Sequence, residues 1–173
     1  MSDDLAQQQR RLRLKKTLSE LSDMLGMGSE LVSAVIPPDR KISDVRQHLG
    51  QEAGQAANIK SKSTKKHVTD AIESAISTIN RYKTPGERGL AIFVGHVITG
   101  NNKTRLITTV VDDPPEPFPS FRYRCDSTFE ISQLEEILAC QTPFSPDLTC
   151  SLSVSYTHLR AHETLRYLVC RLL

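Results

Sequence analysis

The sequence contains no tryptophan and no long apolar segment, and these absences already narrow the classes of protein. Its longest unbroken apolar run, Leu90–Val94, is far shorter than the roughly 20 residues that a helix needs to cross a bilayer. The acidic start Met1–Asp4 precedes no apolar stretch, so no secretory signal is predicted. A hydrophobic fraction of 38% over 173 residues is typical of a folded domain. A membrane protein and a fully disordered chain are therefore excluded, and one domain with a tail is expected.

Cysteine is also scarce, and no two cysteines have the CxxC spacing of redox motifs and zinc ribbons. Without a signal peptide, reduced thiols in a cytoplasmic protein are expected, and a disulfide-stabilised miniprotein is excluded. No P-loop and no Ser-His-Asp arrangement is recognisable, so we predict no cofactor. The four cysteines all lie late in the chain: Cys125, Cys140, Cys150 and Cys170.

Charge is nearly balanced overall, at 22 basic and 20 acidic side chains, but it is uneven along the chain. Residues 1–66 carry 12 basic and 8 acidic side chains, which gives a net charge of +4. Residues 67–138 carry 7 and 10, which gives −3. A basic bias at one end is weak evidence for a polyanionic partner, and a solvated helix face is the simpler interpretation of the basic residues in the first predicted helix.

Hydrophobic periodicity predicts an α+β fold, with a small, mainly antiparallel four-stranded sheet flanked by helices. A protruding αα-hairpin is expected where two helices are joined by the connector 54–62. Ser43 is expected to cap the first helix of this hairpin. The predicted helices cover residues 3–24, 43–53, 63–82 and 131–138, and the predicted strands cover 31–36, 90–98, 104–111 and 121–125.

The tip of the predicted hairpin has four lysines in seven residues and no acidic residue. Ser61, Ser63 or Thr64 can cap the following helix, whose free N–H groups and partial positive charge attract anions. An anion-binding tip and a merely charged, well-capped turn explain this pattern equally well. The four lysines are Lys60, Lys62, Lys65 and Lys66.

Two motifs about sixty residues apart resemble those of the class I peptide chain release factors of archaea and eukaryotes. Asn58-Ile59-Lys60-Ser61 looks like the NIKS motif of that family, and Tyr123–Phe129 fits its YxCxxxF motif. Gly28-Ser29-Glu30 lies where the family has a Gly-Thr-Ser-like segment, but it departs from that pattern at Ser29 and Glu30. The resemblance covers about residues 10–138 and is more archaeal than eukaryotic, with further similar text at 36–38, 89–95 and 99–101.

The resemblance implies an N-terminal domain that reads the stop codons UAA, UAG and UGA of mRNA in the ribosomal A site. It places Lys60 near the first uridine and Glu52 close to the codon. It also implies that Tyr123, Cys125 and Phe129 shape the pocket for the following purines. The implied codon-binding residues are Asn58, Ile59, Lys60, Ser61, Glu52, Tyr123, Cys125 and Phe129, with Gly28, Ser29 and Glu30 as further codon-proximal candidates and Lys62, Lys65 and Lys66 as ligands of RNA phosphates.

The residue types suit that chemistry. A lysine ammonium such as that of Lys60 donates to the carbonyl oxygens of uridine, and a carboxylate such as that of Glu52 accepts from an exocyclic amine. Single-stranded bases are read by edge hydrogen bonds and aromatic stacking, worth about 1–3 kcal/mol per base, which Tyr123 can supply. Simpler roles exist: Glu52 as a solvated carboxylate at a helix end, and Cys125 and Phe129 as core residues.

The Gly-Gly-Gln motif, with which whole release factors promote peptidyl-tRNA hydrolysis, occurs nowhere in these 173 residues. We therefore expect this chain not to be an enzyme. Its implied partners are the stop codon and rRNA, and a translational GTPase that would bind through a C-terminal domain. A monomer without membrane contacts is expected. An RNA- or ribosome-binding module without codon specificity is the alternative, and a free-standing hydrolase is a third hypothesis.

Residues 139–173 do not continue the family pattern. Val154–Thr164 looks like one translated frame of a common sequencing-library adapter, so residues 151–173 are interpreted as an artefact that does not belong to the folded domain. His158 and His162 have the HxxxH spacing of a zinc-binding helix, but Glu163 does not occupy the HExxH position, and no metal site is predicted.

Overall fold

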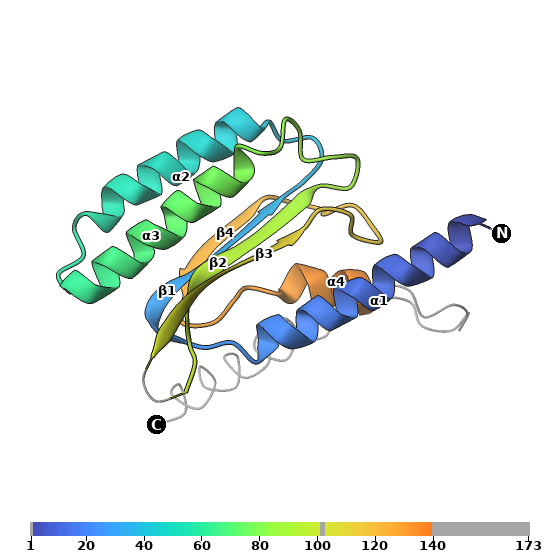
Figure 1. Cartoon of the computed structure of the whole chain (residues 1–173). Coiled ribbons are helices and arrows are strands. Elements are labelled where there is room, and N and C mark those ends of the chain that lie inside the picture. The colour runs from blue at the N-terminus through green and yellow to red at the C-terminus, as the bar shows by residue number, and fades with distance from the viewer. Residues whose placement is uncertain (1, 101–102, 140–173) are drawn as a thin grey trace, which may run out of the picture. The chain divides into compact units, whose positions relative to one another are not determined.

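The computed structural model describes residues 2–100 and 103–139, and the predicted tail beyond Ala139 lies outside them. A four-stranded sheet forms the middle layer of this part of the chain, with helices on both faces (Figure 1). Helices α2 and α3 cover one face, and α1 and α4 lie on the other (Figure 1). The helices are α1 (Ser2–Ser22), α2 (Ile42–Ala56), α3 (Lys62–Ile79) and α4 (Ser132–Ala139), and the strands are β1 (Gly26–Ile36), β2 (Leu90–Ile98), β3 (Thr104–Val111) and β4 (Arg122–Asp126).

The sheet has the strand order β3-β2-β1-β4, and every neighbouring pair is antiparallel. The predicted α+β class and the four-stranded antiparallel sheet are thus confirmed. β2 and β3 match their predicted bounds, because a turn at Gly100, where φ is +40°, and the proline-rich segment after Val111 both interrupt regular structure.

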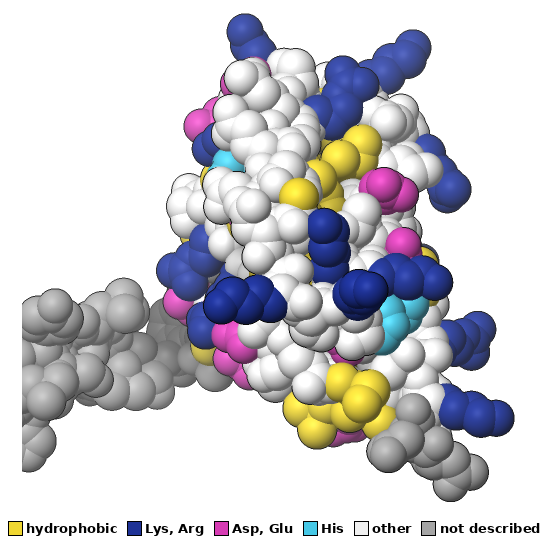
Figure 2. Space-filling view, turned by 90° about the vertical axis from the view of Figure 1, so that its left-hand side faces the viewer, with side chains coloured by type: hydrophobic (Ala, Val, Ile, Leu, Met, Phe, Trp, Pro, Cys, Tyr) yellow, Lys and Arg dark blue, Asp and Glu magenta, His cyan; other side chains and the backbone are white. Residues whose placement is uncertain are grey.

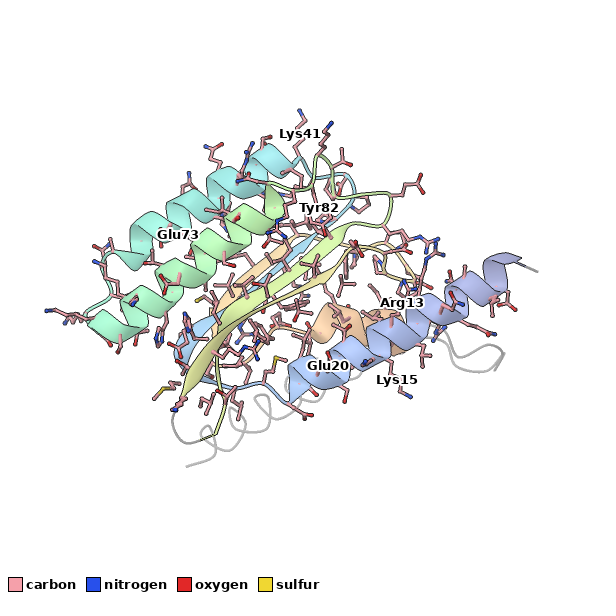
Figure 3. All side chains as sticks on the ribbon, in the orientation of Figure 1. Arg13, Lys15, Glu20, Lys41, Glu73 and Tyr82 are labelled. Carbon is pink, nitrogen blue, oxygen red and sulfur yellow. The ribbon has the colours of Figure 1, made fainter. Side chains whose placement is uncertain are left out.

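Side-chain alternation along the central strands creates two separate cores. Val32 and Ile36 of β1 face α2 and α3, whereas Leu31 and Val35 pack toward α1 and α4. Lys15 on α1 and Lys41 before α2 point away from the sheet in opposite directions (Figure 3). None of the described helices is long and apolar enough to cross a membrane.

The two hairpin helices are confirmed, but their ends differ from the prediction. The N-cap residue of α2 is Lys41, whose side chain makes no cap hydrogen bond, so the prediction of Ser43 as the cap was wrong. The reason is tertiary: Ile42 is buried and starts the helix, which leaves the hydroxyl of Ser43 to donate to Asp44. α2 runs on to Ala56, so the connector between the helices is shorter than the predicted residues 54–62.

β1 begins at Gly26, five residues earlier than predicted. The first part of this strand pairs irregularly with β2, and the prediction covered only the regular part. Gly26 pairs with Val97 and Leu31 pairs with Gly95, so five steps along β1 correspond to two steps along β2. Met27–Glu30 therefore arch out of the ladder, and we call these four residues the bulge. α1 ends earlier, at Ser22, and both Gly26 and Gly28 belong to this irregular start of the strand.

Candidate nucleic-acid-binding site

A groove of about 270 Å³ lies beside the tip of the α2–α3 hairpin, where the hairpin, the bulge and β4 meet. Several lysine and arginine side chains stand out from this end of the molecule (Figure 2). The structure brings together in this groove five residues that the sequence singled out: Ser29, Glu52, Ile59, Tyr123 and Cys125.

One wall of the groove is formed by Tyr123 and Cys125, which lie two residues apart on β4 and share a face of the sheet. Burial, with smaller contributions from Cys125 and Glu52, raises the pKa of the Tyr123 hydroxyl above its ordinary value. Burial also raises the pKa of the Cys125 thiol to about 11, with smaller contributions from nearby carboxylates including Glu52. Both groups are therefore uncharged donors at neutral pH, and the Cys125 thiol donates to the carbonyl oxygen of Ser29 at 3.2 Å.

The tip itself is held by short-range hydrogen bonds. Ser61 caps α3 by accepting from the backbone N–H of Thr64, and its hydroxyl also contacts that of Ser63. The ammonium group of Lys65 donates to the carbonyl oxygen of Ala57 at 2.8 Å, so this lysine fastens the start of α3 to the end of α2. The side chains exposed at the tip and the first turn of α3 include Asn58, Lys60, Ser61, Lys62 and Lys66, whereas Ile59 is half-buried against the core.

Two of the candidate residues point elsewhere. Phe129 is only 5% exposed and packs edge-on against Phe93 in the core on the α1 side, with ring centroids 5.7 Å apart. The chain leaves β4 at Asp126 and pairs Thr128 with Leu25, which directs Phe129 to the face of the sheet opposite Tyr123. The side chain of Glu30 is 2% exposed and points into the interior of the protein. Neither side chain lines the groove.

The groove also contains residues that the sequence analysis did not single out as site residues. Gln55 follows Glu52 by three positions, so both project from one face of α2, and this helical spacing was the available signal. Val68 and Ile72 belong to the apolar stripe of α3, whose periodicity indicates core packing and does not distinguish a groove floor from a core. The remaining residue of this kind is Ala56.

A polar network lies beneath the bulge. One carboxylate oxygen of Glu30 lies 2.6 Å from Nδ1 of His67, whose ring stacks on that of His96 at a centroid distance of 4.1 Å. Nε2 of His96 lies 3.6 Å from the Asp70 carboxylate. Burial and then the charge of His67 lower the pKa of His96, and the carboxylates of Asp70 and Glu30 oppose this shift without reversing it. The network ties α3 to β1 and β2. No group of three metal-ligating side chains suited to a metal ion occurs among the described residues.

This network predicts a pH-dependent stability. Because the pKa of His96 is lower in the folded chain than its ordinary 6.5, the unfolded chain binds a proton more readily, and stability falls as the pH falls through 6.5. Urea unfolding at about pH 8 and about pH 5.5, a window that spans the histidine range, is expected to show a shallower pH dependence in His96→Gln than in the unaltered chain. Equal slopes in the two proteins would contradict this assignment.

Comparisons with known proteins identify the family to which this fold belongs. Residues 9–139 match the family model described as eRF1 domain 1. The peptide chain release factor subunit 1 of Picrophilus torridus is 50% identical over 129 residues, which cover 75% of this chain and 31% of that protein. That of Methanocaldococcus jannaschii is 48% identical over 124 residues, covering 72% and 30% respectively. The chain thus spans about a third of the length of the curated relatives it matches.

A solved structure is similar as well. The crystal structure of an archaeal translation termination factor aligns with a TM-score of 0.65 and 31% sequence identity, over 74% of this chain and 34% of that one. The family match, the relatives and the fold lead to the same result. The chain belongs to the eRF1 domain 1 family and is similar to the N-terminal third of archaeal peptide chain release factors.

Proposed function

We propose that this domain recognises stop codons in the ribosomal A site and so serves translation termination. The observation that carries the proposal is the groove, where the NIKS segment, the YxCxxxF strand and the bulge meet although they are far apart in the sequence. A volume of about 270 Å³ is slightly below the usual range of ligand pockets, which suits single bases better than large cofactors.

The groove offers complementary groups for the edges of bases. Lys60 is exposed at the tip and presents ammonium donors to a uridine carbonyl. Glu52 is half-buried in the groove and presents a carboxylate acceptor for the exocyclic amine of a purine. Tyr123 and Cys125 supply uncharged surface beside it, since both remain protonated at neutral pH. Phe129 contributes indirectly, by anchoring the segment after β4 in the core.

The basic tip supplies the contacts that do not depend on codon identity. Lys62 and Lys66 are exposed at the start of α3, where free N–H groups and the helix dipole add to their charge. They are expected to contact RNA phosphates, whereas Lys65 acts mainly by holding the tip in shape. Ser29 of the bulge is exposed and lines the groove, and Gly28 directly precedes it in the chain.

The wider assignment follows from the family. The domain is proposed to act in the cytoplasm as the decoding part of a factor whose other domains promote peptidyl-tRNA hydrolysis and bind a translational GTPase. The chain itself is proposed to be non-catalytic, and to work without a cofactor. A codon-independent RNA-binding module is the second candidate, because the lysine-rich tip alone would support it.

Competition on ribosomes tests the proposal. The chain is titrated against an intact archaeal release factor on ribosomes with UAA or a sense codon in the A site. Lys60→Ala is expected to weaken binding to the UAA complex by at least about tenfold, because a hydrogen bond from a charged group contributes about 1.5–3 kcal/mol. Binding to the sense-codon complex should change much less.

Lys83→Ala is the matched control, since Lys83 is exposed beyond the other end of α3. It removes the same charge and is expected to leave the codon preference unchanged. If the unaltered chain binds both complexes equally, and binding weakens only with salt, the tip merely docks on phosphates. That outcome would support the second candidate.

A further inference from the structure

We propose that His67 is a positioning residue that clamps the bulge through Glu30. This clamp keeps the carbonyl group of Ser29 hydrogen-bonded to Cys125, so that the groove stays narrow on that side. The proposal rests on the proposed function for its effect on codon discrimination, whereas the clamp itself is independent of it. His67 lies on α3 outside the groove, so the effect would be transmitted through the bulge.

The bulge needs an external support because it leaves the β1–β2 ladder between Gly26 and Leu31. Glu30 provides a link in two directions. One of its carboxylate oxygens accepts from the backbone N–H of Met27 at 3.0 Å, which closes the arch upon itself. The other lies 2.6 Å from Nδ1 of His67, which fastens the arch to α3. A carboxylate that is 2% exposed requires such partners, since water cannot solvate it there.

His67 is in turn held in place. Its ring stacks on His96 of β2 with an interplanar angle of 20°, and His96 faces Asp70 one turn further along α3. The anchor of the bulge therefore belongs to the layer that also carries the NIKS tip, because α3 begins directly after Ser61. Tip and bulge are two margins of one groove that share α3 as their support.

The bulge is also hydrogen-bonded to the wall of the groove. Cys125 donates its thiol to the carbonyl oxygen of Ser29, the residue next to Glu30. If His67 loses its donor, the buried carboxylate keeps only the N–H of Met27 and gains by moving toward water. Because Ser29 adjoins Glu30, this movement would draw the carbonyl away from Cys125 and widen the groove. The thiol of Cys125 therefore reports on the clamp without any ribosome.

The first test is the reactivity of that thiol. In the full chain with Cys140, Cys150 and Cys170 replaced by serine, only Cys125 can react with an aromatic disulfide reagent. His67→Ala is expected to raise the reaction rate about tenfold, because the lost bond involves a charged group. His67→Asn should restore the slow rate, since its amide nitrogen occupies the same δ position as Nδ1 and donates to the carboxylate.

Ser74→Ala is the matched control. Ser74 also lies on α3 and also bonds across to the sheet, through its contact with Thr108, but it is remote from the bulge. Its replacement is expected to leave the rate unchanged. Should His67→Ala fail to fold, Glu30→Ala/His67→Ala removes the buried charge together with its partner. The bulge then loses both of its attachments, to Met27 and to α3, so the thiol should still become more reactive. An unchanged rate in the folded variants would overturn the clamp.

The second test measures codon discrimination in the competition assay. His67→Ala is expected to reduce the ratio of UAA to sense-codon affinity about fivefold while leaving the salt dependence as it was, since no phosphate contact is lost. His67→Asn should keep the ratio. A purely structural role would lower both affinities equally and would overturn the effect on discrimination. If the unaltered chain has no codon preference, the proposed function fails, and the thiol rates still decide whether the clamp exists.

Discussion

Replacing Gly89 with alanine is expected to lower the free energy of unfolding by about 3–5 kcal/mol, a large share of a domain's stability. Gly89 lies directly before β2 and has a φ of +89°, a region that residues with a side chain rarely adopt. A Cβ atom there would lie 2.4 Å from the carbonyl oxygen of Ile36 and 3.0 Å from Phe118. The end of β1, the start of β2 and the segment before β4 all meet at this point, so relief of the clash would disturb both cores.

Gly86→Ala separates the cost of the backbone conformation from the cost of the steric clash. Gly86 has a φ of +82°, but the nearest atom to an added Cβ is the carbonyl oxygen of Asp112, 4.0 Å away. Its replacement carries the cost of backbone conformation alone, about 1–2 kcal/mol. Urea unfolding of both variants and of the unaltered chain measures the difference. Equal losses for Gly86→Ala and Gly89→Ala would show that the close approach to Ile36 does not matter.

Gly95→Ala is expected to lower the free energy of unfolding by about 2–3 kcal/mol, and also to loosen the candidate site. An added Cβ would lie 2.8 Å from the carbonyl oxygen of Glu30 and 2.8 Å from Cα of Leu31. Both are backbone atoms, so rotation of a side chain cannot relieve the contact. The bulge would have to rise from β2, and the reaction rate of Cys125 should increase together with the loss of stability.

Gly28→Ala provides the comparison within the bulge itself. No atom lies within 4 Å of a Cβ added at Gly28, and its φ is not in the left-handed region. Its stability should therefore change by less than about 0.5 kcal/mol, with an unchanged thiol rate. If Gly95→Ala behaves in the same way as Gly28→Ala, the bulge does not rest closely on β2.

The sequence by itself determined the fold class and the types of all the elements. It also marked three segments that meet at the groove, namely 28–30, 58–61 and 123–129. The apolar stripe of α3 repeats with a clear helical period, and the apolar run of β2 ends in turn residues, so these signals are local. NIKS and YxCxxxF were readable for the same reason, since each is a short continuous segment. Glu52 and Tyr123 were chosen by resemblance, and the structure places both in the groove.

Tertiary structure alone decided the features that depend on contacts between distant segments. Burial of Ile42 overrode the capping preference of Ser43, and the path of the chain after β4 turned Phe129 away from Tyr123. The pairing of Glu30 with His67 joins residues 37 positions apart, and no local pattern marks either as the other's partner. A buried carboxylate takes whatever donor the packed layers bring within reach, and that choice is made by the sheet register and by the helix that lies across it.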